Sequence, residues 1–175
     1  MDIQALKLEG AHVIDLERFE DERGFFARAW CSQELEKHGL DHQIVQANVS
    51  MNAKAGTVRG MHFQVSPYEE TKFVRCTSGR LYDVIVDIRP DSSTYLEWLS
   101  VELSADNHRT LYIPKGFAHG FQTLEDNTEV FYLHTEYYHP QSAGGFRWDD
   151  PRIGIDWPIA APSMISEKDQ NWPLL

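Results

Sequence analysis

Hydrophobic and polar residues alternate in several short runs that are bounded by turn residues, a pattern typical of β-strands. In residues 81–88 the two faces of such a strand separate clearly, with Tyr82, Val84, Val86 and Ile88 on one face and Asp83 and Asp87 on the other. This alternation predicts a half-buried antiparallel strand. The same reasoning predicts strands over residues 57–63, 72–76, 81–88, 99–103, 110–113 and 128–138.

Helical patterns are few and short. Ser32 is predicted to cap a helix over residues 33–38 that Gly39 ends, and Ser166 is predicted to open a second helix near the C-terminus. We therefore expect an all-β barrel with a few short helices. The chain of 175 residues has the size of one domain and contains neither an internal repeat nor a Gly/Ser linker, so we expect residues 1–175 to form a single domain.

Composition and charge narrow the possible partners. Hydrophobic residues make up 42% of the chain, enough for a core without disulfides, and 16 basic against 27 acidic residues give a net charge of −11. That sign disfavours nucleic acid and anionic membranes as partners. The chain has no signal peptide pattern, no long apolar run and only two cysteines, Cys31 and Cys76. We expect a soluble protein of the reducing cytoplasm.

Two motifs have the spacing of metal-binding cupins. The first contains Gly56, His62 and Glu69, and the second contains Pro114, Gly116 and His119. The second histidine of the first motif is replaced by Gln64, whose neutral amide is a poor substitute for imidazole as a ligand. The preferred interpretation is a cupin barrel with no metal. The alternative is a metal site made by His62, His119 and Glu69.

Without a metal, the residues of the two motifs and of the strands around them suit proton transfer. They supply imidazole, ammonium, phenol and guanidinium groups, from His62, His119, Lys72, Tyr132 and Arg59. The sequence contains no nucleophile-elbow motif and no glycine-rich phosphate loop. General acid–base catalysis is therefore the favoured chemistry.

Taken together, the motifs resemble the dTDP-4-dehydrorhamnose 3,5-epimerase family along nearly the whole chain. The matching segments are 21–26 (DERGFF), 46–50 (QANVS), 59–64 (RGMHFQ), Lys72, 83–89 (DVIVDIR), 113–121 (IPKGFAHGF), Tyr132, 148–151 (WDDP) and 166–169 (SEKD). The resemblance implies a cupin-type double-stranded β-helix, or jelly roll, that forms a homodimer and uses no metal or other cofactor. It also implies that the enzyme inverts carbons 3 and 5 of a nucleotide-linked 4-keto-6-deoxyhexose.

The resemblance assigns four catalytic roles. His62 is the base, oriented by Asp169; Tyr132 is the acid; and Lys72 places a positive charge at the enolate oxygen. Both carbons flank a ketone, so inversion needs a base on one face, an acid on the other and a cation for the developing oxyanion. For Asp169 an alternative stays open, because Ser166 to Asp169 also has the form of a helix-capping box.

Substrate binding is assigned in the same way. The family pattern points to Arg23, Arg59 and Lys168 for the diphosphate, with Gln46, Asn48 and His119 as polar contacts and Tyr138 as a stacking surface for the base. Strand parity puts Gln46 with Asn48 and Tyr132 with Tyr138, but it separates Arg59 from His62 unless a bulge at Gly60 intervenes.

Three positions depart from the family pattern. Arg28 and Ala143 stand where the family usually has glutamate near the ligand, and Glu70 stands where it often has glutamine. These departures leave open another nucleotide base or inversion at one carbon only. The residues are also compatible with a 3,4-ketoisomerase, with a metal-dependent cupin enzyme and with a sugar-binding barrel that has no catalytic activity.

Overall fold

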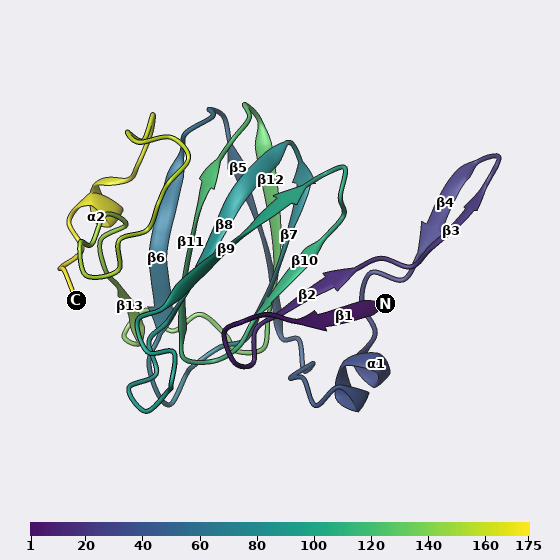
Figure 1. The fold of residues 1–175 in the computed structure, drawn as a ribbon, viewed down its shortest axis with the longest axis horizontal. Helices are drawn as coiled ribbons and strands as arrows, with labels where there is room; N and C mark the ends of the chain where they lie inside the picture. The colour runs from purple at the N-terminus through teal and green to yellow at the C-terminus, as the bar shows by residue number, and fades with distance from the viewer.

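Two antiparallel sheets face each other and close into a barrel (Figure 1). The computed structural model describes all residues from 1 to 175. The first sheet has six strands, in the order β1 (Asp2–Ala5), β2 (His12–Asp15), β10 (Thr110–Ile113), β7 (Lys72–Ser78), β12 (Thr128–His134) and β5 (Gln46–Asn52). The second has five, in the order β13 (Ala143–Gly145), β6 (Val58–Gln64), β11 (Phe117–Thr123), β8 (Arg80–Asp87) and β9 (Trp98–Ser104).

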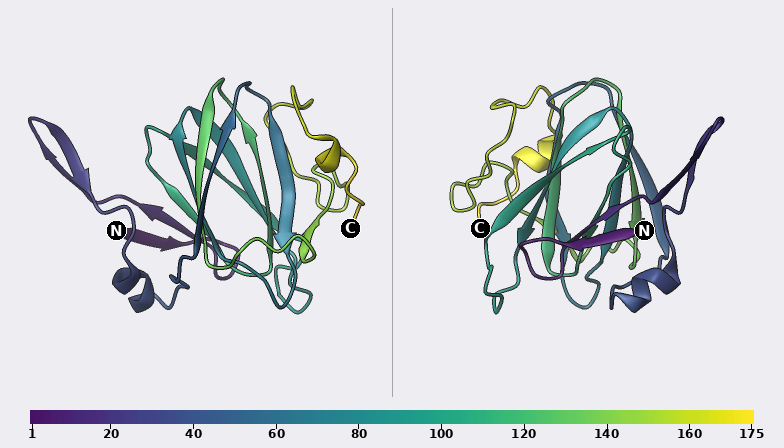
Figure 2. Two further views of the ribbon diagram at one scale, coloured as in Figure 1. Left: turned by 180° about the vertical axis from the view of Figure 1, so that it is seen from behind. Right: turned by 45° about the vertical axis from the view of Figure 1, so that its right-hand side comes forward.

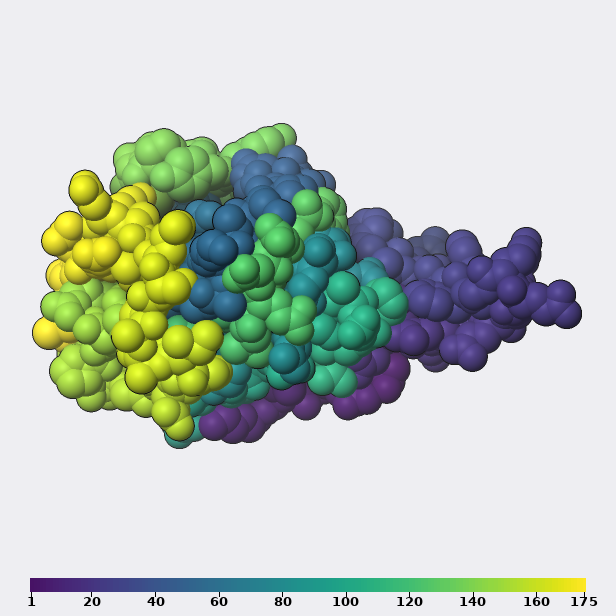
Figure 3. Space-filling model, turned by 90° about the horizontal axis from the view of Figure 1, so that it is seen from above, coloured from purple at the N-terminus to yellow at the C-terminus, as the bar shows by residue number.

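The remaining elements flank the barrel. Strands β3 (Arg18–Asp21) and β4 (Gly24–Ala27) form a hairpin that projects away from the barrel (Figures 1 and 3). On the opposite side, the C-terminal segment with helix α2 (Glu167–Gln170) lies against β6 (Figure 2). Helix α1 (Ser32–Lys37) follows the hairpin. The predicted all-β barrel with few short helices is confirmed.

The six predicted strands all exist, although β12 is shorter than predicted. The sequence pattern did not predict the other seven strands, β1 to β5, β11 and β13. Strand β12 ends at His134, and residues up to Tyr138 continue as a loop. The shared strand face predicted for Tyr132 and Tyr138 is therefore wrong. The hydrophobic pattern gives no clear signal for β11 because Gly116 precedes this segment and Gly120 lies within it.

Strand β8 is buried on both faces, which corrects the prediction of a half-buried strand. Leu81 and Ile85 belong to the hydrophobic core inside the barrel. Val84 and Val86, on the other face of the strand, pack under the C-terminal segment. Asp83 is fully buried on the interior face. The alternation exists, but the C-terminal segment covers the face that a simple sheet would expose.

The helix caps were partly predicted. Ser166 does cap α2, since its hydroxyl accepts a hydrogen bond from the Asp169 amide at 3.1 Å. Ser32 does not cap α1: it is the first helical residue, and Cys31 occupies the cap position without a side-chain hydrogen bond. Helix α1 is held instead by Leu35, which packs with Phe73 and Tyr112 on the outside of the six-stranded sheet.

A bulge in β6 brings Arg59 and His62 to the same side, as predicted. His119 of β11 pairs with His62 and Phe121 pairs with Arg59, so β6 carries one extra residue in this interval. Gly60 lies there with φ of 138°, and a Cβ on it would meet the Gly120 Cα at 2.5 Å. Only glycine fits this close approach of two backbones.

None of the helices has the length and apolar character needed to cross a membrane.

Candidate active site

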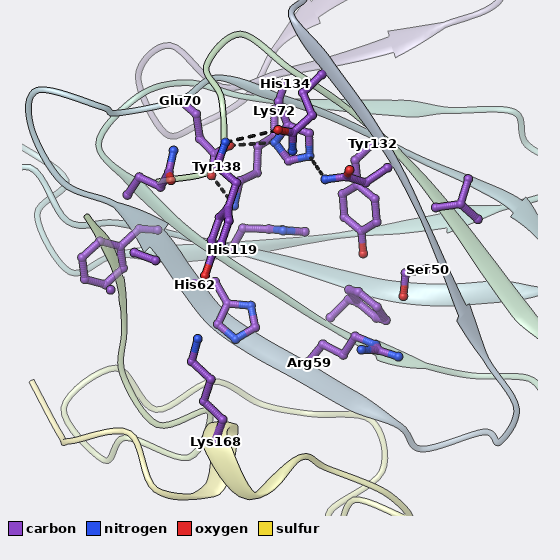
Figure 4. A pocket seen from close by; sticks show the side chains of 18 of the residues that line it. Ser50, Arg59, His62, Glu70, Lys72, His119, Tyr132, His134, Tyr138 and Lys168 are labelled. Atoms are coloured by element: carbon purple, nitrogen blue, oxygen red, sulfur yellow. Dashed lines mark hydrogen bonds and ion pairs between the residues drawn. The ribbon is translucent and has the colours of Figure 1, made fainter. Parts of the chain in front are cut away.

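A pocket of about 330 Å³ opens into the barrel and is lined from both sheets (Figure 4). Strands β6 and β11 form one wall, and strands β5, β7 and β12 form the other. Lys168 and Trp172 of the C-terminal segment close one side. The pocket brings together most of the residues predicted for the site: Gln46, Asn48, Arg59, His62, Lys72, His119, Tyr132, Tyr138 and Lys168.

His62 and Asp169 form a hydrogen-bonded pair at the pocket wall. The Nε2 atom of His62 lies 2.6 Å from Oδ1 of Asp169, and the His62 side chain is 41% exposed while that of Asp169 is 6% exposed. Burial raises the pKa of Asp169, but hydrogen bonds from His62, Gly60 and Ser166 outweigh it and hold this pKa below its usual value. Since the carboxylate accepts the Nε2 proton, Nδ1 is free of protein partners and available as a base.

The hydrogen-bond partners of the Asp169 carboxylate lie outside helix α2. The cap of α2 is the Ser166 hydroxyl, while the carboxylate is directed to His62, to the Gly60 amide at 3.4 Å and to the Trp172 indole at 3.3 Å. In a capping box, this carboxylate would instead accept a hydrogen bond from the backbone amide of the N-cap residue.

A second histidine and aspartate pair lies across from the first. His119 Nε2 is 2.5 Å from Oδ1 of Asp83, and both side chains are buried. The other oxygen of Asp83 is buried and has no protein hydrogen-bond partner. His119 stands directly opposite His62 in the pairing of β11 with β6.

Tyr132 extends from β12 toward the pocket, with its ring 6.3 Å from that of His119 (Figure 4). Burial raises the pKa of Tyr132 well above its ordinary value, and the nearby Asp83 carboxylate raises it further. The phenol therefore keeps its proton at neutral pH and can donate it.

Lys72, the first residue of β7, lines the pocket with its ammonium 3.2 Å from Glu70. The ion pair keeps a mostly buried positive charge next to the pocket. Arg59 lies further along, where its Nε donates to Asn52 at 2.7 Å. Tyr138 lies on the loop after β12, and its amide donates to Gln46 Oε1 at 3.2 Å.

Comparison with known proteins gives a consistent result. A family model described as dTDP-4-dehydrorhamnose 3,5-epimerase matches residues 5–175. The enzyme of that name from Methanothermobacter thermautotrophicus is 46% identical over 167 residues, covering 94% of this chain and 89% of that protein. The chain belongs to the dTDP-4-dehydrorhamnose 3,5-epimerase family. The predicted family, fold and enzyme class, an isomerase, are confirmed.

Solved structures of the epimerase family carry ligands. The Bacillus anthracis dTDP-4-dehydrorhamnose 3,5-epimerase with TDP and PPi bound matches with a TM-score of 0.95 and 44% identity, covering 99% of each chain. The Legionella pneumophila epimerase in complex with dTDP-4-keto-L-rhamnose matches with a TM-score of 0.89 and 37% identity, covering 96% of this chain and 89% of that chain.

Arg23 does not line the pocket of its own chain, unlike the other residues predicted to bind the substrate of the epimerase family. It lies in the turn of the projecting hairpin, is 89% exposed and pairs with Asp21. The hairpin carries Arg23 away because it packs on no other strand. Arg28 also lies outside the pocket and pairs with Glu34, whereas Ala143 of β13 does line it.

The geometry does not favour a metal site made by His62, His119 and Glu69. Glu69 does not line the pocket, and no cluster of three or more His, Cys, Asp or Glu side chains is arranged to hold an ion. Gln64 instead serves the epimerase fold: its amide donates to the carbonyls of Tyr68 and Tyr137 and accepts from the amide of His139.

The residues in or beside the pocket that were not assigned a role from the sequence include Glu70, Asp83, His134 and Trp172. Asp83 has a signal, since its β8 position alternates with hydrophobic residues, but that alternation by itself predicts a solvent-facing side. Trp172 follows the last matching motif and donates to Asp169. His134 sits on the strand of Tyr132 at the same parity, which places both on the pocket face.

Proposed function

We propose that this chain epimerises a dTDP-linked 4-keto-6-deoxyhexose at carbons 3 and 5 by proton transfer through an enolate. The observation that carries the proposal is the position of His62 and Tyr132 on opposite sheets facing one pocket, which Lys72 also lines from β7, the strand next to that of Tyr132. Inversion requires proton removal on one face of a carbon and delivery on the other, which a single group does not achieve.

Each group has a defined part in the reaction. His62 Nδ1 takes the proton from the carbon beside the ketone, the C–H electron pair becomes part of the enolate, and Asp169 stabilises the resulting imidazolium. The Lys72 ammonium stabilises the negative charge on the enolate oxygen. Tyr132 returns a proton to the opposite face of the same carbon, which re-forms the ketone.

The remaining pocket residues fit the rest of the substrate. Arg59 and Lys168 supply the positive charges that a diphosphate requires in a chain whose net charge is −11. Gln46, Asn48 and His119 are assigned to polar contacts, and Tyr138 to stacking on the nucleobase. The relatives with TDP or a dTDP sugar bound support a thymidine diphosphate.

The projecting hairpin supports the proposed homodimer. Phe19 is 69% exposed and Phe26 is 74% exposed on it, and such apolar exposure on an isolated hairpin is costly in water. A second copy that covers these rings would bring the hairpin, with Arg23, to a neighbouring pocket. This arrangement explains how Arg23 binds the diphosphate although it lies outside its own pocket.

The proposal is tested by incubating the protein with dTDP-4-keto-6-deoxyglucose in D₂O and following the product by NMR. We expect deuterium at carbons 3 and 5 together with inversion at both. Inversion and labelling at one carbon would identify a single-carbon epimerase, and a 3-keto product would identify a ketoisomerase. Tight binding of the sugar nucleotide without exchange would indicate a binding protein, and each of these three results would overturn the proposal.

A further inference from the structure

Three ionisable side chains that the reaction scheme only partly uses meet at one end of the pocket. The side chains of Glu70, Lys72 and His134 are 11%, 10% and 9% exposed, respectively. Glu70 Oε1 lies 3.2 Å from Lys72 Nζ, and its other oxygen, Oε2, lies 2.7 Å from His134 Nδ1 (Figure 4). Lys72 and His134 are paired across β7 and β12, so the backbone fixes their separation.

Glu70 is ionised in this setting. Burial raises the pKa of Glu70, but the hydrogen bond from His134 and the positive charge of Lys72 outweigh burial and hold this pKa below its usual value. The carboxylate uses one oxygen for each neighbour. It is also the only anionic partner of the Lys72 ammonium in the structure.

His134 extends the connection to a fourth residue. Its Nε2 lies 3.2 Å from Asn48 Nδ2, and an amide nitrogen only donates hydrogen bonds. Nε2 is therefore the acceptor, the ring proton lies on Nδ1, and that proton is donated to Glu70. The Asn48 amide is held by its nitrogen, and its carbonyl oxygen has no protein partner and remains for a ligand.

We propose that Glu70 and His134 are positioning residues, which hold the Lys72 ammonium in place for the enolate and orient the Asn48 amide for the nucleotide portion of the substrate. The inference rests on the proposed function of the pocket and goes beyond it, since neither residue touches the reacting atoms.

Two substitutions test separately the positioning of Lys72 by Glu70 and the orientation of Asn48 by His134. Glu70→Gln keeps the shape of the side chain but replaces one acceptor oxygen with an amide NH₂ group. A donor of either Lys72 or His134 then faces an N–H group and not an acceptor. We expect kcat to fall about tenfold, with KM changed less than about threefold, because a slightly misplaced cation weakens transition-state stabilisation. His134→Phe frees the Asn48 amide, and we expect dTDP to bind about fivefold more weakly in calorimetry.

Double variants show whether the effects pass through the assigned partners. In a Lys72→Ala background, Glu70→Gln is expected to produce no further loss of kcat, and in an Asn48→Ala background His134→Phe is expected to produce no further loss of dTDP affinity. Fully additive losses would overturn the proposal, as would single variants with wild-type kcat and dTDP affinity.

A matched control removes a buried carboxylate elsewhere. Asp87 is fully buried and pairs with Arg89 away from the pocket, so Asp87→Asn makes the same carboxylate-to-amide change. It is expected to lower the melting temperature and leave kcat and KM unchanged. If the wild-type protein fails to epimerise the substrate, the proposed function fails. The dTDP measurements still test whether His134 orients the Asn48 amide.

Discussion

The imidazole of His62 is bound through Nε2 to the Asp169 carboxylate at 2.6 Å, which leaves the opposite ring nitrogen toward the pocket. The two residues are distant in sequence, one in the bulged strand β6 and the other in helix α2 of the C-terminal segment. The base is therefore oriented by its carboxylate only when the C-terminal segment is docked on the barrel.

Asp169→Asn is expected to lower kcat by about 10²–10⁴-fold, because the amide neither fixes the ring proton on Nε2 nor stabilises the imidazolium. Epimerisation rates with dTDP-4-keto-6-deoxyglucose measure this loss. Ser166→Ala is the control: it removes the helix cap at a cost of about 1 kcal/mol in stability and keeps the carboxylate. Equal loss of kcat in both variants would mean that Asp169 acts only through the helix.

Tyr132→Phe is expected to separate proton exchange from inversion. His62 still removes and returns protons on its own face, so solvent deuterium enters the substrate while epimer formation falls by about 10²–10⁴-fold. NMR in D₂O reports both quantities in one sample. Because the pKa of Tyr132 lies well above its usual value, wild-type activity should not decline through this group between about pH 7 and about pH 9. Wild-type epimerisation by the phenylalanine variant would remove Tyr132 from the acid role.

Mixing two defective variants tests whether the hairpin of one copy supplies Arg23 to the pocket of another. If Arg23 of one copy serves the His62 of another, a heterodimer of Arg23→Ala and His62→Asn chains has one intact site and one doubly defective site. Refolding the two chains together at equal amounts should restore about a quarter of the wild-type sites at low substrate concentration. If both residues served the same chain, mixing would restore nothing.

The stability contributed by Asp87 should depend on pH in a defined direction. Burial raises the pKa of Asp87, but hydrogen bonds from Arg89, Ser92 and Thr94 outweigh it and lower this pKa far below its usual value. A lowered folded-state pKa stabilises the protein above the unfolded pKa of about 3.9, and the stabilisation is lost as the pH falls from there toward the folded value. Asp87→Asn should therefore destabilise by about 1–3 kcal/mol at about pH 7 and by less at about pH 3, measured by urea unfolding. An equal difference at both pH values would contradict this.

The sequence by itself determined the barrel class, six of the thirteen strands and most of the side chains assigned to catalysis and binding. Alternation marks strands locally, and the motifs around His62 and His119 lie on paired strands β6 and β11, so their proximity follows once the barrel closes. The bulge at Gly60 could also be inferred from the sequence, because Arg59 and His62 cannot share a face of a regular strand.

Only the tertiary structure decided which partners these side chains have. Asp83 faces His119 and not solvent because the C-terminal segment covers the other face of β8, and Asp169 reaches His62 because that same segment docks on β6. Glu70, Lys72 and His134 meet through the pairing of β7 with β12. Arg23 leaves the pocket because its hairpin pairs with no other strand. Local patterns fix the direction of a side chain along its own strand, whereas its partner depends on contacts between segments that are distant in the chain.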